Sequence, residues 1–125
     1  MFVNCLVVGA GGFIGSILRY LVTLVMPASA SALGTLSINV VGSFVIAMIA
    51  ALVIVGVMPD EHLSLMLRVG VCGGFTTLAA FSLEASELIG HGAYLGAVGY
   101  AVITCALCIG AAMLGTWLVR AMGLG

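Results

Sequence analysis

Residues 70–77 read Gly70-Val71-Cys72-Gly73-Gly74-Phe75-Thr76-Thr77 and lie in the middle of an apolar run. A pair of glycines followed by two threonines weakens an α-helix. In a membrane, interrupted backbone is tolerated only where it is buried in protein or faces a cavity. The stretch therefore predicts a membrane-spanning helix broken near its centre. The alternative is a continuous helix whose glycines pack against a neighbouring helix.

Outward from this stretch, the chain has the composition of a membrane protein. Of its 125 residues, 64% are apolar and 6% are charged, whereas a soluble domain carries roughly 25% charged residues. Four apolar runs are long enough to cross a bilayer, at about residues 2–25, 34–57, 63–89 and 93–121. Pro27 and Pro59 lie in the breaks between runs, where helices end. We expect one domain, residues 1–125, of the all-α integral membrane class, with four transmembrane helices, the third one broken.

The three arginines give the chain no clear orientation in the membrane. With four spans, Arg68 and Arg120 lie toward the face that holds both termini, and Arg19 lies toward the opposite face. Orientation follows an excess of Lys and Arg on one side, and this difference is too small to fix it. We therefore expect insertion in both orientations and an antiparallel dimer.

Small residues four positions apart predict close helix packing, because they let helix backbones approach in lipid. Such pairs include Gly11 with Gly15, Gly92 with Gly96, Ala106 with Gly110, and Ala111 with Gly115.

Several function classes are excluded or disfavoured by the sequence. A net charge of −1 without a basic cluster excludes nucleic-acid binding. An enzyme is disfavoured because no nucleophile, base and orienting group cluster at membrane depth, and His62 and His91 fall in loops. The cysteines lie in apolar runs and are interpreted as small apolar side chains. Cys105 and Cys108 form a CxxC, but no second pair or nearby histidine completes a zinc site.

Polar side chains at membrane depth are site candidates, because a polar group without a partner is costly there. Arg19 could reach the membrane interface or line a vestibule. Asn39 could hold two helices together by a hydrogen bond, or donate to an anion or to water in a pathway. Phe81 could present a positive ring edge to an anion or simply pack. Glu84 and Glu87 lie near the end of the third run, where we expect them to be hydrated.

Three motifs occur in order along the chain. They are Gly11-Gly12-Phe13-Ile14-Gly15 with Arg19-Tyr20, Gly34-Thr35-Leu36 with Asn39 and Gly42, and Cys72-Gly73-Gly74-Phe75-Thr76-Thr77 leading to Phe81-Ser82. With these motifs the chain resembles the CrcB/Fluc family of fluoride channels. The resemblance implies a channel subunit that exports cytoplasmic fluoride across the cell inner (plasma) membrane. It also implies an antiparallel dimer with two narrow pores at the subunit interface.

The same resemblance implies roles for particular residues. A sodium ion would be buried at the dimer centre, held by the backbone carbonyls of Gly73 and Thr76. Asn39 would donate to fluoride, Phe81 would present its ring edge, and Arg19 would raise the anion concentration in the vestibule. Thr77 and Ser82 would also belong to the pore.

One segment departs from the family pattern Thr-Thr-Phe-Ser-Thr-Phe. This chain reads Thr76-Thr77-Leu78-Ala79-Ala80-Phe81. Because Leu has no electropositive ring edge and Ala has no donor, a pore lined by Leu78, Ala79 and Ala80 should be drier and slower. Either a related chain completes one working pore in a heterodimer, or a homodimer conducts weakly or not at all. We favour the heterodimer as a hypothesis.

Two other functions are weighed against the channel. Small four-helix multidrug exporters need an ionisable carboxylate in the first span, and no Asp or Glu precedes Asp60. A non-conducting membrane assembly subunit needs no site, which would leave Asn39, Arg19 and the glycine-threonine break unexplained.

Overall fold

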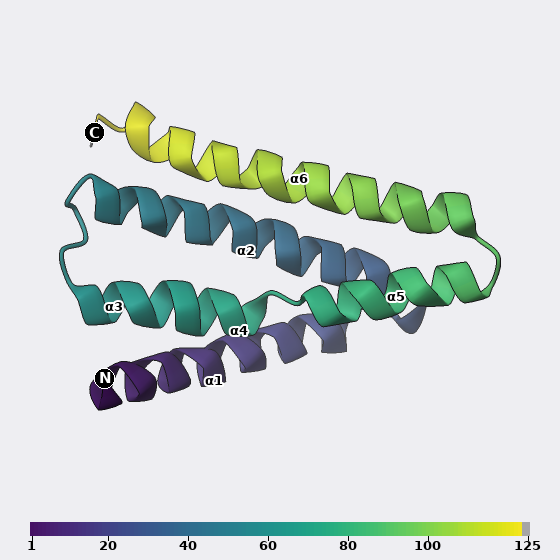
Figure 1. The fold of residues 1–125 in the computed structure, drawn as a ribbon, viewed down its shortest axis with the longest axis horizontal. Helices are drawn as coiled ribbons and strands as arrows, with labels where there is room; N and C mark the ends of the chain where they lie inside the picture. The colour runs from purple at the N-terminus through teal and green to yellow at the C-terminus, as the bar shows by residue number, and fades with distance from the viewer. Residues whose placement is uncertain (124–125) are drawn as a thin grey trace.

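The computed structural model describes residues 1–123, which form an all-helical bundle (Figure 1). In chain order its elements are α1 (Phe2–Val25), a 3-10 turn η1 (Ala28–Ala30), α2 (Ser31–Ile54), α3 (Glu61–Leu65), a π-helical segment η2 (Met66–Cys72), α4 (Gly73–Phe75), α5 (Leu78–Gly90) and α6 (Tyr94–Ala121). Helical stretches long and apolar enough to cross a membrane are Phe2–Val25, Ala28–Ile54, Glu61–Gly90 and Tyr94–Ala121. The predicted all-α, four-span architecture is confirmed.

The third span is broken, as the sequence predicts. It runs helically from Glu61 to Phe75 and resumes at Leu78. Between these halves the backbone is extended, with φ −74° and ψ 155° at Thr76 and φ −149° and ψ 110° at Thr77. Figure 1 shows this connection between α4 and α5. The interpretation as a continuous helix is therefore wrong.

Glycines bring the first and third spans into close contact. A β-carbon on Gly11 would overlap the carbonyl oxygen of Met66, and one on Gly15 would overlap that of Val71. On the other side of the bundle, α2 and α6 lie side by side (Figure 1), and a β-carbon on Gly115 would meet the Phe44 carbonyl oxygen at 2.5 Å. These glycines permit the backbone approach expected of small residues in lipid.

The other glycine pairs do not act in this way. Gly92 has φ +76° and turns the chain between α5 and α6, a backbone conformation that glycine adopts without strain. A β-carbon on Gly110 would meet nothing within 4 Å. The expectation of close packing at these two positions is not met within the described chain.

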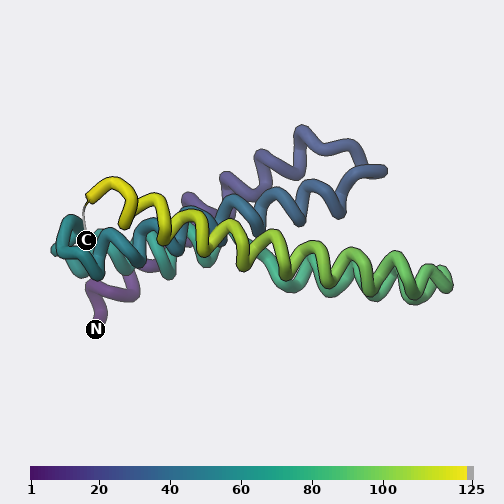
Figure 2. The backbone as a smooth tube through the Cα atoms, turned by 90° about the horizontal axis from the view of Figure 1, so that it is seen from above, coloured from purple at the N-terminus to yellow at the C-terminus, as the bar shows by residue number. Residues whose placement is uncertain are grey.

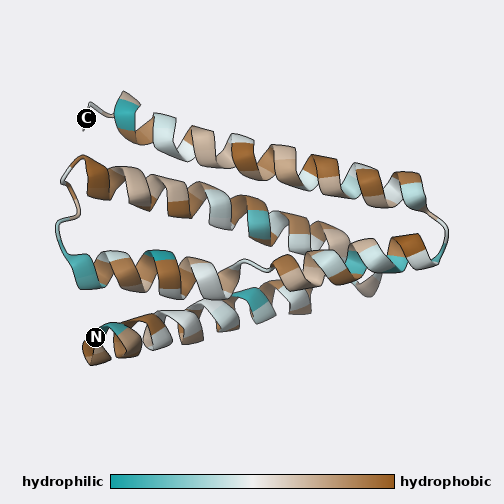
Figure 3. Ribbon diagram, viewed as in Figure 1, coloured by the Kyte–Doolittle hydropathy of each residue, from teal (hydrophilic) through white to brown (hydrophobic). Residues whose placement is uncertain are grey.

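Most of the apolar surface of this single copy is uncovered. Large side chains such as Leu95 (90% exposed) and Ile54 (84% exposed) face outward, and the hydropathy colouring in Figure 3 shows apolar residues around the helices. Such a surface suits contact with lipid. Figure 2 shows that the connected ends of α1 and α2 diverge from the connected ends of α5 and α6.

Candidate functional site

The break in the third span is held by a side chain of α2. The side-chain amide nitrogen of Asn39 donates to the backbone carbonyl oxygen of Thr77 at 3.1 Å, and the Thr77 backbone N–H donates to the side-chain oxygen Oδ1 of Asn39 at 2.8 Å. These bonds satisfy both backbone polar groups of an extended residue at membrane depth. The structure thus confirms the helix-joining interpretation of Asn39. An amide nitrogen carries two hydrogens, so one N–H remains for another partner.

The two threonines of the break cap the helix halves. The Thr76 hydroxyl donates to the Cys72 carbonyl oxygen at 2.9 Å, which also accepts from the Thr76 N–H. The Thr77 hydroxyl accepts from the Ala80 N–H at 3.2 Å, as a cap at the start of α5. Threonine at both positions therefore ends one half-helix and begins the next.

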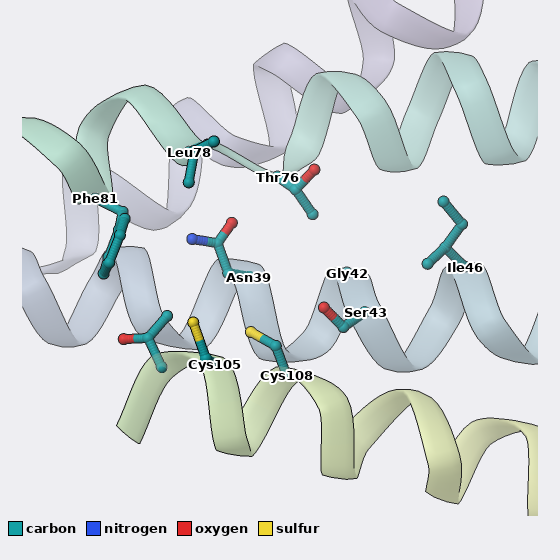
Figure 4. Close-up of a pocket in the computed structure, with 10 residues that line it drawn as sticks. Asn39, Gly42, Ser43, Ile46, Thr76, Leu78, Phe81, Cys105 and Cys108 are labelled. Atoms are coloured by element: carbon teal, nitrogen blue, oxygen red, sulfur yellow. The ribbon is translucent and has the colours of Figure 1, made fainter. Parts of the chain in front are cut away.

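A cavity of about 330 Å³ lies beside the break, between α2, the third span and α6 (Figure 4). Its lining residues are Asn39, Gly42, Ser43, Ile46, Thr76, Leu78, Phe81, Thr104, Cys105 and Cys108. We call it the first cavity. Within residues 1–123 the Thr104 hydroxyl has no hydrogen-bond partner, although Thr104 is only 6% exposed. The first cavity therefore combines an apolar wall with hydrogen-bond donors that lack protein partners.

A second cavity of about 250 Å³ lies on the α1 side of the break. Its lining residues are Ser16, Arg19, Tyr20, Thr23, Thr35, Ile38, Thr77 and Ala80. Its wall contains five hydroxyl side chains and the half-buried side chain of Arg19. The hydrogen-bonded pair lies in the wall between the two cavities, because Asn39 lines the first and Thr77 the second.

A hydrogen-bond network around Glu84 was not predicted. One carboxyl oxygen accepts from the Thr35 hydroxyl at 2.8 Å and the other accepts from the Tyr100 hydroxyl at 2.7 Å. The Tyr100 ring also packs on Phe81, with ring centres 5.1 Å apart. Glu84 is half-buried, so the expectation that this carboxyl is simply hydrated is wrong. Glu84 follows Phe81 by three residues, about one helical turn. This spacing could have predicted that the two side chains lie on the same face of the helix.

The sequence profile of one protein family, described as "CrcB-like protein, Camphor Resistance (CrcB)", matches residues 6–116 of this chain. The chain belongs to the CrcB family.

Among its relatives in the CrcB family is the "Fluoride-specific ion channel FluC" of Rhizobium meliloti (strain 1021). The two are 42% identical over 122 residues, which cover 95% of this chain and 98% of the relative. Proteins of the same name from Rhizobium leguminosarum bv. trifolii (strain WSM2304) and Ruminiclostridium cellulolyticum are 41% and 38% identical over 123 and 122 residues. Those alignments cover 96% and 94% of this chain and 98% and 93% of the relatives. The predicted family is confirmed, and these relatives are named as ion channels rather than enzymes.

The fold of this CrcB chain brings part of the predicted site together. Asn39, Thr76, Leu78 and Phe81 all line the first cavity. Arg19, Thr77 and Ala80 line the second cavity instead. Three predicted residues are exposed and line neither of the two cavities: Gly73, Ala79 and Ser82.

Proposed function

We propose that this chain is a subunit of a fluoride channel that lets cytoplasmic fluoride leave through the cell inner (plasma) membrane. The main support for this proposal is the first cavity. There the Asn39 side chain has one N–H without a protein acceptor, and the buried Thr104 hydroxyl has no protein partner within the described residues. Fluoride holds its water tightly, so a narrow pathway must replace part of that water with donors. The Phe81 ring in the same wall adds a positive edge. The names of the relatives supply the identity of the ion.

Arg19 has a supporting role in this proposal. Its guanidinium carries a permanent positive charge and lines the second cavity beside Thr77. A cation in a concave, poorly solvated site raises the local concentration of anions. We assign the second cavity as the vestibule, with Thr77 in the wall between it and the first cavity.

We further propose that the subunit works as a dimer inserted in antiparallel fashion. Gly73 is exposed in this single copy although it lies next to the broken backbone. Irregular backbone at membrane depth must be shielded from hydrocarbon. A second subunit packed over the third span would supply that shield. The nearly even distribution of arginines fits insertion in both orientations.

The backbone at the break fits the proposed central sodium ion. In a continuous helix, the Gly73 carbonyl would accept from the Thr77 N–H. That N–H donates to Asn39 instead, so the helical ladder leaves the Gly73 carbonyl without its usual donor. Carbonyl oxygens are suitable ligands for a hard cation. The Gly73 and Thr76 carbonyls of two subunits would hold the ion and hold the subunits together.

The departure at Leu78, Ala79 and Ala80 supports a heterodimer. Leu78 lines the first cavity and is 75% exposed, so an apolar side chain lies where the family pattern has an aromatic ring. Ala79 is exposed and offers no donor. We propose that a related chain with the complete motif supplies the conducting pore, while the features that hold the dimer remain in this chain.

Fluoride efflux from liposomes tests the channel and its composition. The purified chain alone should give slow efflux, and co-reconstitution with a related chain should give fast fluoride efflux without chloride efflux. Robust efflux from the chain alone would contradict the heterodimer but support the channel. Absence of fluoride efflux in both preparations would contradict the channel.

The exporter and the non-conducting assembly subunit are not favoured, because the chain belongs to the CrcB family. In addition, the first span, Phe2–Val25, contains no carboxylate that could exchange protons for a cationic drug. Proton-coupled uptake of such a drug into liposomes would support the exporter and contradict this conclusion.

A further inference from the structure

Two cysteines of α6 face the same cavity. Cys105 and Cys108 are three residues apart on one continuous helix, a spacing that places both side chains on one face. Both line the first cavity, and Figure 4 shows their sulfur atoms pointing into it from α6. The other two cysteines do not line this cavity: Cys5 lies on α1 and is exposed, and Cys72 lies in the third span and is buried.

The first cavity is large enough to hold water beside both thiols. Its volume of about 330 Å³ is several times the roughly 30 Å³ that one water occupies in the liquid. Ser43 and Asn39 offer polar contacts in its wall. Thr104 adds an independent observation, since its hydroxyl is buried and has no partner within residues 1–123. An unpaired buried hydroxyl is uncommon in native structures, and this one belongs to a residue of the cavity wall.

We propose that Cys105 and Cys108 bind one soft, thiophilic monovalent cation of the Cu(I) or Ag(I) class. Thiolate ligands select such cations over hard ones. Within the described residues no group of three or more His, Cys, Asp or Glu side chains is placed to hold a metal. A pair of thiols alone therefore favours a cation that accepts two ligands over tetrahedral Zn²⁺.

Binding changes the charge of the cavity wall. Each thiol loses its proton to cavity water as its sulfur coordinates the cation. Two thiolates and one monovalent cation leave a net charge of −1 where two neutral thiols stood before. If the proposed fluoride pathway runs through the first cavity, this charge opposes anion passage, so the bound cation acts as an inhibitor.

The binding test does not depend on transport. The detergent-purified protein is titrated anaerobically with Cu(I) against a chromophoric Cu(I) chelator. We expect one Cu(I) per chain, with affinity lowered at least tenfold in Cys105→Ser and in Cys108→Ser. The matched control, Cys5→Ser, should bind as the unchanged protein does. Each variant is first checked for an unchanged elution volume by size exclusion.

Two results would overturn the site: no Cu(I) uptake by the unchanged protein, or undiminished uptake by the Cys105→Ser and Cys108→Ser double variant. Should the double variant fail to fold, the same titration is made with Cys105→Ala. An affinity for Cu(I) equal to that of the unchanged protein would then overturn the site.

A second measurement tests the inhibitory effect. Ag(I), added to liposomes containing the protein and a related chain, should slow fluoride efflux at least tenfold, and the double variant should be insensitive. Equal inhibition of both proteins would overturn the assignment of inhibition to these thiols. If the liposomes show no efflux at all, the proposed function fails, and the Cu(I) titration still decides the binding site.

Discussion

Gly42 of α2 lies so close to Thr76 that a β-carbon on Gly42 would overlap the Thr76 γ-methyl group. The absence of a side chain at Gly42 thus lets the extended backbone of the break pack directly on α2. The Thr76 hydroxyl, on the same side chain, donates to the Cys72 carbonyl in the last turn of the first half-helix. The shape of the break depends on this contact as well as on the Asn39 bonds.

Gly42→Ala should therefore destabilise the protein. The added methyl group must displace Thr76, and overpacking of this kind costs about 1–3 kcal/mol. Thermal unfolding of the detergent-purified variant measures the loss. Gly99→Ala is the matched control, because a β-carbon there would meet nothing within 4 Å. Equal stability of Gly42→Ala and the unchanged protein would contradict the close packing.

Asn39→Asp should test the proposed donor role of Asn39. A carboxylate can still accept from the Thr77 N–H, but it cannot donate to the Thr77 carbonyl or to an anion. We expect fluoride efflux from the co-reconstituted channel to fall at least tenfold. Asn39→Ala removes both bonds, and leaving the buried backbone groups unpaired should cost about 1–3 kcal/mol of stability. An Asp variant with undiminished efflux would contradict donation from Asn39 to fluoride.

Restoring the family pattern should increase conduction by this chain alone. The triple variant Leu78→Phe, Ala79→Ser and Ala80→Thr adds an aromatic ring and two donors next to the break. Fluoride efflux from liposomes containing only this variant should exceed that of the unchanged chain. Leu83→Phe is the control, since it adds a ring to an exposed position of α5 outside the first cavity. An equal rise in both variants would refute a specific effect of the motif.

The Glu84 network should couple Thr35 to Tyr100. Tyr100→Phe keeps the ring against Phe81 and removes the hydroxyl, which should cost about 1.5–3 kcal/mol because the bond is to a carboxyl group. Thr35→Val removes the other donor to the same carboxyl. The two stability losses should be non-additive in a double-mutant cycle, because both bonds share Glu84. Strict additivity would indicate that the two hydroxyls act independently.

Gly11→Ala should disrupt the contact between the first and third spans. Its methyl group would meet the Met66 carbonyl oxygen, and backbone cannot move aside as a side-chain end can. The variant should lose folded yield, read as the monodisperse fraction by size exclusion. Gly9→Ala, two residues away on α1, would meet nothing within 4 Å and should behave as the unchanged protein. Comparable yields of Gly11→Ala and Gly9→Ala would argue against the contact.

Local composition was sufficient to predict the spans and the break. Four apolar runs of sufficient length require four helices, since only internally hydrogen-bonded backbone is stable in lipid. The break follows from glycine and threonine between residues 73 and 77, which weaken a helix wherever they occur.

Features that depend on distant partners could not be predicted in this way. Asn39 and Thr77 are 38 residues apart, and the sequence left two interpretations of the amide open. Glu84 bonds to Thr35, 49 residues away, and no local pattern identifies that partner. The π-helical form of Met66–Cys72 likewise has no signature in its residues. That segment includes Gly70, which packs against Gly11 on another helix.

The π-helical segment also makes the exact number of residues in the third span matter. Each π-type turn closes between residues five apart rather than four, so it contains one residue more than an α-turn. If the same seven residues, Met66–Cys72, formed an ordinary α-helix, α3 would be rotated by about 100° relative to α4. Gly70 and Gly11 would then no longer face each other. The π-helical segment thus sets the rotation of α3, which follows the loop after α2, relative to α4 at the break.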